Sequence, residues 1–141
     1  MKRRVLFLCT GNSARSQMAE GLLRHLAGDR YDVFSAGTYP VGLNPLAVSV
    51  MQELGVDISA QRSKNMDEFT DQTFDYVVTV CDRAKGFCPR WPHTGSLMHW
   101  SFEDPAVAMG TSEEQRHAFR TVRDQIKSHL EEFLSTRTPV V

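Results

Sequence analysis

Two residues whose types and spacing could do chemistry stand near the start of the chain: Cys9 and Arg15, with five residues between them. A loop of this length can curl into a cup whose backbone N–H groups point inward, as they do in other anion-binding nests. Arg15 can then hold a tetrahedral oxyanion with two hydrogen bonds, while Cys9 lies beneath its central atom. The pattern therefore predicts an oxyanion site with a thiol nucleophile at its base.

The residues of this loop suit that role. Gly11 and Asn12 tolerate positive φ, and a helix beginning near Ser16 would add its positive N-terminal end. Such a field favours the thiolate form of Cys9. Asn12 could also lock the loop through its side chain. Ser16, like Ser13, could donate to the sulfur or could serve only as a turn or cap residue. The predicted oxyanion-binding residues are Thr10, Gly11, Asn12, Ser13, Ala14, Arg15 and Ser16.

A carboxyl group is the next requirement, because transfer of a phosphoryl or arsenyl group needs an acid that protonates the leaving oxygen. Asp104 is the candidate. Pro105 follows it, biases it away from helical conformation and stiffens its approach to a site. The alternative is an ordinary Asp-Pro turn with no catalytic role.

The other two cysteines, Cys81 and Cys88, are separated by six residues. This spacing does not match a zinc site, and the five histidines are scattered along the chain. Gly86 and neighbouring charged residues would allow the segment to bring Cys88 to Cys81. The pair can therefore be interpreted either as a thiol relay or as two small buried hydrophobic residues.

Composition bounds the possible partners. The chain has 141 residues, 41% hydrophobic and 23% charged, which is ordinary for one globular domain over residues 1–141. Its net charge of −1 offers no footprint for nucleic acid or an anionic membrane. The apolar run that ends at Cys9 is too short for a membrane span or a signal peptide. We therefore expect a cytoplasmic protein with no nucleic-acid or membrane partner, whose three cysteines are not structural disulfides.

Alternating elements must position these residues. The pattern predicts strands over Arg4–Cys9, Tyr31–Ala36, Phe74–Val80 and Ser96–Trp100. It predicts helices over Ser16–Leu26, from Asn44 and Pro45 to Gly55, and from Thr111 or Ser112 onward. The expected fold is α/β, a single three-layer domain with a four-stranded parallel sheet flanked by helices. Since Cys9 and Cys81 each follow a strand, both should lie at the carboxyl edge of the sheet, where such folds bind ligands.

These residues resemble a known family. The segment Cys9–Gly21 is similar to the phosphate-binding loop and first helix of low-molecular-weight protein tyrosine phosphatases. It is more similar still to their relatives, the thioredoxin-coupled arsenate reductases. The pair Cys81 and Cys88 is the specific part, because simple phosphatases of this fold lack it. The resemblance covers nearly the whole chain and continues through Ser35-Ala36-Gly37, Asn44-Pro45, Val77–Cys81, Cys88-Pro89, His99-Trp100 and Asp104-Pro105.

The resemblance implies a three-sulfur reaction without a metal or organic cofactor. Cys9 would attack arsenate held by Arg15 and the loop, and Asp104 would protonate the departing hydroxyl group. Cys81 would then attack the sulfur of Cys9, releasing arsenite and forming a disulfide. Cys88 would move that disulfide to the 81–88 pair, where thioredoxin or a similar thiol reductant would reduce it.

Two positions depart from the family pattern. Ala14 stands where many family loops have a second cysteine, which removes a competitor for disulfide formation with Cys9 and should not harm catalysis. Some members bind potassium near the loop, where an acidic side chain is replaced here by Lys64. Its ammonium could pair with Glu20, so we expect no potassium dependence. The predicted loop-supporting residues are Asn12, Ser16, Glu20, Ser35 and Lys64.

Two other functions stay open at this stage. The same cup could form a phosphocysteine and hydrolyse phosphomonoesters, and Trp100 and Phe102 lie near Asp104 in the sequence, where they could grip an aromatic ring or belong to the core. A non-catalytic anion-binding or redox-sensing module is the third reading, and it would need an unactivated Cys9 thiol. We expect a monomer under each reading.

Overall fold

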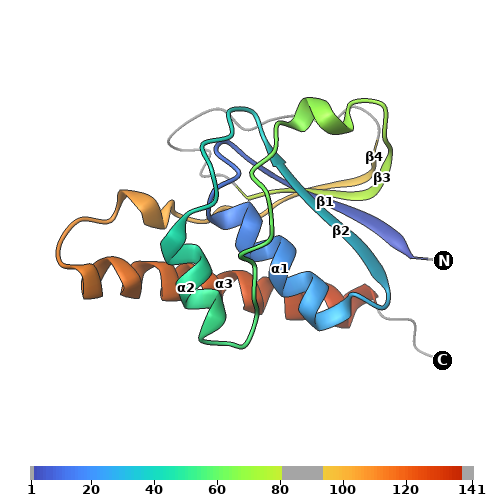
Figure 1. The fold of residues 1–141 in the computed structure, drawn as a ribbon. Coiled ribbons are helices and arrows are strands. Elements are labelled where there is room, and N and C mark those ends of the chain that lie inside the picture. The colour runs from blue at the N-terminus through green and yellow to red at the C-terminus, as the bar shows by residue number, and fades with distance from the viewer. Residues whose placement is uncertain (1, 81–93, 138–141) are drawn as a thin grey trace.

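A four-stranded parallel sheet lies at the centre of the molecule, with strand order β2-β1-β3-β4 (Figure 1). The computed structural model describes residues 2–80 and 94–137. In chain order the elements are β1 (Arg3–Cys9), α1 (Arg15–Ala27), β2 (Tyr31–Gly37), α2 (Pro45–Gln52), the 3-10 helix η1 (Met66–Phe69), β3 (Phe74–Thr79), β4 (Thr94–His99), the 3-10 helix η3 (Pro105–Val107) and α3 (Ser112–Arg137). The α/β fold predicted from the sequence is confirmed, with β4 lying slightly earlier than expected.

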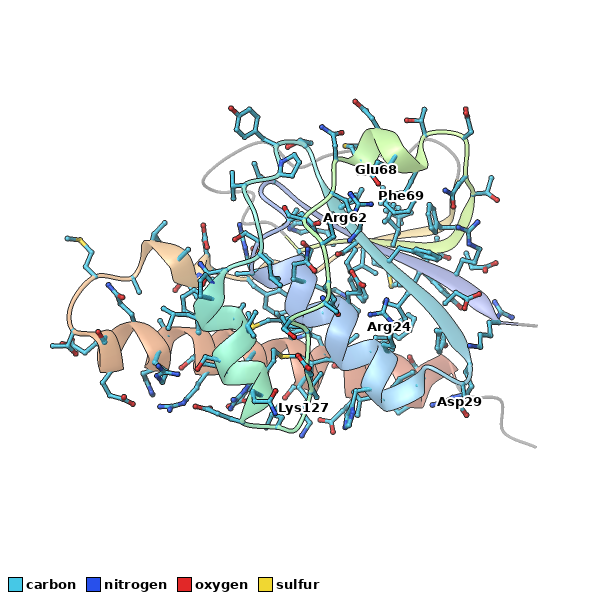
Figure 2. All side chains as sticks on the ribbon, in the orientation of Figure 1. Arg24, Asp29, Arg62, Glu68, Phe69 and Lys127 are labelled. Carbon is cyan, nitrogen blue, oxygen red and sulfur yellow. The ribbon has the colours of Figure 1, made fainter. Side chains whose placement is uncertain are left out.

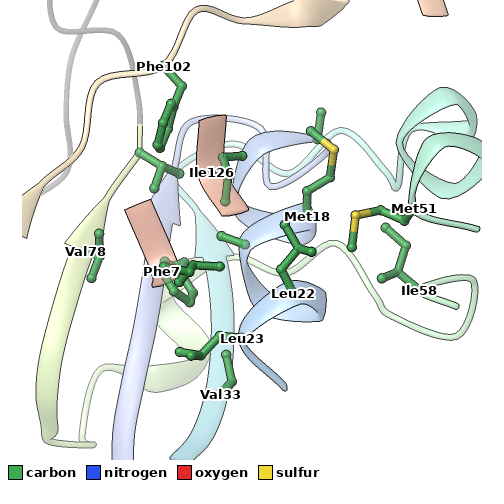
Figure 3. Packing of buried hydrophobic residues seen from close by; sticks show 14 of the residues in the cluster. Phe7, Met18, Leu22, Leu23, Val33, Met51, Ile58, Val78, Phe102 and Ile126 are labelled. Carbon is green, nitrogen blue, oxygen red and sulfur yellow. The ribbon is translucent and has the colours of Figure 1, made fainter. Parts of the chain in front are cut away.

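Alternation along β1 divides the core between the two faces of the sheet. Val5 and Phe7 face α1, α2 and α3, and contribute to the larger hydrophobic cluster, part of which Figure 3 shows around Phe7, Met18 and Leu22. Leu6 and Leu8 face the opposite side, where they pack in a smaller cluster with side chains that include Phe69 of η1. Burial on both faces explains why β1 reads as a continuous apolar run.

The helix α2 begins where the sequence predicts. The Asn44 side chain accepts a hydrogen bond from the Leu46 N–H group at 2.8 Å, and Pro45 occupies the first helical position. The helix ends at Gln52, and Gly55 follows with φ of 75°.

Half-buried ion pairs hold α2 against α3. The guanidinium of Arg120 hydrogen-bonds the Glu53 carboxylate and, with Arg123, lowers the pKa of Glu53 to about 2. Arg123 also donates to the Val50 carbonyl at 2.7 Å. These contacts fix α2, whose first residues adjoin the site described next.

No helix in the described ranges is long and apolar enough to cross a membrane.

Candidate active site

The loop between β1 and α1 lies at the carboxyl edge of the sheet, as the spacing of Cys9 and Arg15 predicts. β1 ends at Cys9 and α1 begins at Arg15, so residues 10–14 form the turn between them. Cys9 pairs with Gly37 in β2, and Leu8 pairs with Thr79 in β3. The helix has no side-chain cap, so its N-terminal N–H groups remain directed toward the loop.

The carbonyl groups of this loop point away from its interior. Main-chain N–H groups of the neighbouring segment hold three of them: Tyr39 donates to Thr10 at 2.9 Å, Val41 to Gly11 at 3.0 Å and Asn44 to Ser13 at 3.0 Å. The Asn12 carbonyl accepts from the side chain of Gln17 at 3.1 Å. In a trans peptide the N–H group points opposite to the C=O group, and the described chain has no cis peptide. The N–H groups of residues 11–14 therefore point inward, and the loop is a nest for an anion.

Cys9 lies at the base of this nest, 2% exposed. Its Sγ atom accepts the Asn12 N–H group at 3.2 Å and lies 2.8 Å from the Ser16 hydroxyl. That hydroxyl already accepts a hydrogen bond from the Asn12 side chain at 2.8 Å, which leaves its own hydrogen to donate to the sulfur. The sulfur is therefore surrounded by hydrogen-bond donors at the base of the nest. Of the two roles left open for Ser16, the geometry favours the one beside the sulfur.

Asn12 is the centre of the loop. It is fully buried and has φ of 45°, the left-handed conformation that asparagine tolerates. Its side-chain amide donates to Ser16 and to Ser35, and its side-chain carbonyl accepts from Gln17 at 3.0 Å and from the Lys64 N–H group at 2.7 Å. All of its hydrogen-bonding capacity is used, so the residue locks the loop as predicted.

Arg15 and Asp104 lie together at the mouth of the nest. The Arg15 guanidinium is largely buried, donates to the Phe102 carbonyl at 3.2 Å and lies 3.9 Å from the Asp104 carboxylate. The other oxygen of Asp104 caps η3 by accepting the Ala106 N–H group at 3.0 Å. Asp104 thus makes the Asp-Pro turn that the sequence offered as the alternative, and the same turn places its carboxylate beside Arg15.

A cavity of about 110 Å³ lies inside this arrangement. It exceeds the ~30 Å³ share of one water molecule in the liquid and suits a small tetrahedral anion. A larger cavity of about 490 Å³ lies beside β4 and α3, where apolar and aromatic side chains line much of it and no cysteine of the described chain does, so we assign the chemistry to the smaller one. The smaller cavity is lined by Cys9, Gly11, Ser13, Ala14, Arg15, Val41, Asp104 and Ala106.

A second polar cluster supports the loop from behind. Ser35 accepts from the Asn12 side chain at 2.9 Å and donates to the buried Glu20 carboxylate. The Lys64 ammonium lies 3.8 Å from Glu20 and donates to the Arg62 carbonyl at 2.6 Å. Burial lowers the pKa of Lys64, against the opposing field of Glu20. The structure therefore brings together all the loop-supporting residues named from the sequence.

Phe102 is buried in the core, the half-buried Trp100 packs against the core, and neither lines the small cavity. The Trp100 ring packs 6.2 Å from that of Phe7, and Phe102, 3% exposed, packs 4.9 Å from the ring of His129. Of the two interpretations that the sequence left open, the core one is correct. The apolar side chains of described residues that line the small cavity beyond the loop are those of Val41 and Ala106.

Cys81 and Cys88 lie outside the described residues. The last described residue before them, Val80, donates its N–H group to the Leu8 carbonyl at 2.9 Å, one residue from Cys9. The carboxyl ends of β1 and β3 are therefore neighbours, as the sequence predicts. In residues 2–80 and 94–137 there is no cluster of three metal-ligating side chains.

Sequence reasoning missed two residues that shape the site. Gly37 lies behind the loop, where a Cβ atom would come within 2.5 Å of the Thr10 carbonyl oxygen. Gln17 holds the Asn12 carbonyl. A signal for Gly37 existed, because its strand ends at the same sheet edge as Cys9. The sequence holds no comparable signal for Gln17, since a glutamine in a helix is ordinarily a surface residue.

Comparison with known proteins places this chain in a family. The model for low-molecular-weight phosphotyrosine protein phosphatases matches residues 4–138. The chain belongs to this family. It is 48% identical over 135 residues to an arsenate reductase from Halalkalibacterium halodurans, covering 96% of this chain and 97% of that protein.

Solved structures of family members agree with this assignment. An arsenate reductase in the phosphate-binding state superposes with a TM-score of 0.81 and 34% identity, over 96% of this chain and 98% of that one. A thioredoxin-dependent arsenate reductase from Corynebacterium glutamicum superposes with a TM-score of 0.70 and 28% identity, over 96% of this chain and 61% of that one. These structures share the fold of this chain over nearly its whole length.

Proposed function

We propose that this chain reduces arsenate to arsenite. The observation that carries the proposal is the nest itself, with the sulfur of Cys9 at its base and Arg15 and Asp104 at its mouth. This arrangement suits a tetrahedral oxyanion bound for nucleophilic attack. The names of the relatives, which are arsenate reductases over nearly the whole chain, support arsenate as the substrate.

The first step is formation of a Cys9–arsenic bond. The thiolate attacks arsenic while the inward N–H groups and Arg15 stabilise the charge on the oxygens. Asp104 donates a proton to the departing hydroxyl group, which leaves as water. Asp104 is therefore the general acid and Arg15 the clamp.

The second step transfers electrons to arsenic. A thiolate at Cys81 attacks the sulfur of Cys9, and the sulfur–arsenic bond breaks with its electron pair remaining on arsenic. Arsenic passes from the +5 to the +3 state, arsenite leaves, and a Cys9–Cys81 disulfide forms. Cys88 then attacks Cys81, which frees Cys9 and leaves an 81–88 disulfide for an external dithiol. Thioredoxin is the dithiol we propose, in line with the thioredoxin-dependent relative.

Phosphomonoester hydrolysis is the second candidate, because the family is named for it and the same nest can hold phosphate. Cys9 would then form a phosphocysteine and Asp104 would protonate the leaving alcohol. The names of the relatives favour arsenate as the main substrate. Among the described residues that line the cavity none is aromatic, and Phe102 is buried in the core.

A coupled assay tests the proposed function. Wild-type protein with thioredoxin, its reductase and NADPH should oxidise NADPH continuously when arsenate is added. Cys88→Ser should release about one arsenite per enzyme and then stop, because the Cys9–Cys81 disulfide cannot move outward. Arsenite is measured directly alongside NADPH. Many turnovers by this variant would contradict the relay, and no arsenite from the wild type would contradict the function.

The chemistry also bears on where and how the protein works. Its three thiols must return to the reduced state in every cycle, so we propose that it acts in the cytoplasm, where thiols are kept reduced. Every proposed catalytic group comes from one chain, so we propose a monomer.

Lys64 makes a potassium ion unnecessary in this site. Its ammonium lies 3.8 Å from the Glu20 carboxylate, and the Arg24 guanidinium lies 2.7 Å from the other oxygen of the same carboxylate, so a further cation there would meet like charge. We expect the melting temperature and the arsenate reductase rate to be the same in potassium and sodium chloride at equal ionic strength. Lys64→Asp is the matched variant: it removes the ammonium, adds a carboxylate, and should gain a potassium-specific rise in melting temperature. A potassium effect on the wild type that sodium does not reproduce would overturn this prediction.

A further inference from the structure

We propose that Gln17 is a positioning residue of the oxyanion nest: its side-chain amide holds the Asn12–Ser13 peptide so that the Ser13 N–H group faces the anion. This inference rests on the proposed role of the nest in binding a tetrahedral oxyanion. It concerns a residue that touches neither Cys9 nor the anion and that acts through Asn12.

The Gln17 amide group is fully buried and donates to carbonyl oxygens on two separate segments. Its Nε2 atom lies 3.1 Å from the Asn12 main-chain oxygen, 3.0 Å from the Asn12 side-chain oxygen and 3.0 Å from the Arg62 oxygen. A buried carbonyl oxygen without a hydrogen-bond donor costs free energy of folding. These oxygens therefore require a side chain that is long enough to reach them and that donates a hydrogen bond.

The Asn12 carbonyl differs from the other loop carbonyls in how it is held. Those of Thr10, Gly11 and Ser13 are fixed by main-chain N–H groups, which any residue except proline supplies. The Asn12 carbonyl accepts instead from the side chain of Gln17. Because C=O and N–H are antiparallel across a trans peptide, fixing this oxygen outward fixes the Ser13 N–H inward. The orientation of one nest donor thus depends on one side chain.

Gln17 is itself held in place from the outer side. Gln61 donates to the Gln17 side-chain oxygen at 2.8 Å and to its main-chain oxygen at 3.0 Å, and accepts from Arg24 at 3.2 Å. The segment that carries Gln61 approaches α1 closely at Gly21, where a Cβ atom would lie 2.4 Å from the Ile58 side chain. Gly21 therefore allows the contact between Gln61 and Gln17.

Arg62 completes the support. Its carbonyl accepts from Gln17, and its guanidinium makes two hydrogen bonds, at 2.6 and 2.9 Å, to Glu68 of η1 (Figure 2). The segment that faces the Gln17 amide is thus tied to η1, and the amide has a fixed set of acceptors on both sides. A rigid donor is what a preorganised anion site needs, since no reorganisation then accompanies binding.

Inorganic phosphate provides the probe. Its dissociation constant is measured by protection of Cys9 from alkylation, on protein whose folding is checked by circular dichroism. Gln17→Met keeps the length of the side chain but removes the donor, and we expect phosphate binding about tenfold weaker or more, as for loss of one hydrogen bond to a charged group. Gln61→Met is the graded comparison: it removes the outer support of Gln17 but leaves the Gln17 donor and its bonds to Asn12 available, so phosphate binding should weaken less than in Gln17→Met.

A second variant keeps the inference testable if Gln17→Met does not fold. Gln17→Glu keeps the shape and the acceptor for Gln61, but at pH 8 its carboxylate cannot donate to the Asn12 carbonyl, so phosphate binding should be weakened at least as much. A purely structural role would lower the melting temperature of these variants and leave phosphate binding by the folded protein unchanged, and that result would overturn the inference. Equal weakening by Gln61→Met would overturn it as well. If the wild type itself binds no phosphate, the proposed oxyanion site fails instead.

Discussion

Replacement of Cys81 by serine should abolish arsenate reduction and leave phosphomonoester hydrolysis intact. The reduction needs a second thiolate that attacks the sulfur of the Cys9–arsenic adduct and leaves the electron pair of the broken bond on arsenic. A serine hydroxyl cannot form the disulfide that this step produces. We expect the steady-state rate with arsenate to fall at least about 1,000-fold, as for loss of a nucleophile. Any hydrolysis of an aryl phosphate should stay within about twofold, because water rather than a thiol resolves a phosphocysteine. Both rates are measured on the same preparation.

Cys9→Ser is the control, since both reactions begin at this sulfur and both should be lost. Retention of arsenate turnover in Cys81→Ser would mean that an external thiol attacks the Cys9 adduct directly, and the internal relay would be wrong. Loss of both activities in Cys81→Ser would assign this residue a role in building the nest.

The main features of the site were predictable because they depend on local spacing. The interval from Cys9 to Arg15 is long enough for only one turn between a strand and a helix, and parallel strands bring their carboxyl ends to one edge. Asn44 and Pro45 likewise mark the start of α2 through contacts within a few residues. Such features require no knowledge of distant packing.

The features that escaped prediction depend on contacts between segments distant in sequence. Gln17 becomes a buried donor only because Arg62 and Gln61 lie across from it. Trp100 packs against the core because the α3 residue Phe133 lies beside it, with ring centroids 6.0 Å apart. A sequence pattern reports which residues are polar or aromatic, and it does not report which surface meets them.

Among the described glycines near the nest, Gly37 is the one whose replacement by alanine should damage the nest most. Gly37 ends β2 beside Cys9, and its missing side chain leaves room for the loop. A Cβ atom there would lie 2.5 Å from the Thr10 oxygen, 2.9 Å from the Asn12 nitrogen and 3.0 Å from the Cys9 oxygen. All three are backbone atoms of the nest, so no side-chain rotation can relieve the clash, and the loop must move.

We expect this variant to lose about 2–3 kcal/mol of stability, as overpacking of a tight site does. Its kcat/KM for arsenate should fall about 100-fold or more, because displacing the loop misdirects at least one N–H donor. Gly55→Ala is the matched control: its positive φ makes alanine cost about 1–2 kcal/mol, but no atom lies within 4 Å of the added methyl group, and arsenate kinetics should be unchanged. Thermal unfolding and the thioredoxin-coupled assay give the two quantities. A Gly37→Ala protein with wild-type kcat/KM would mean that the loop tolerates displacement, and the preorganisation attributed to its outward carbonyls would then be wrong.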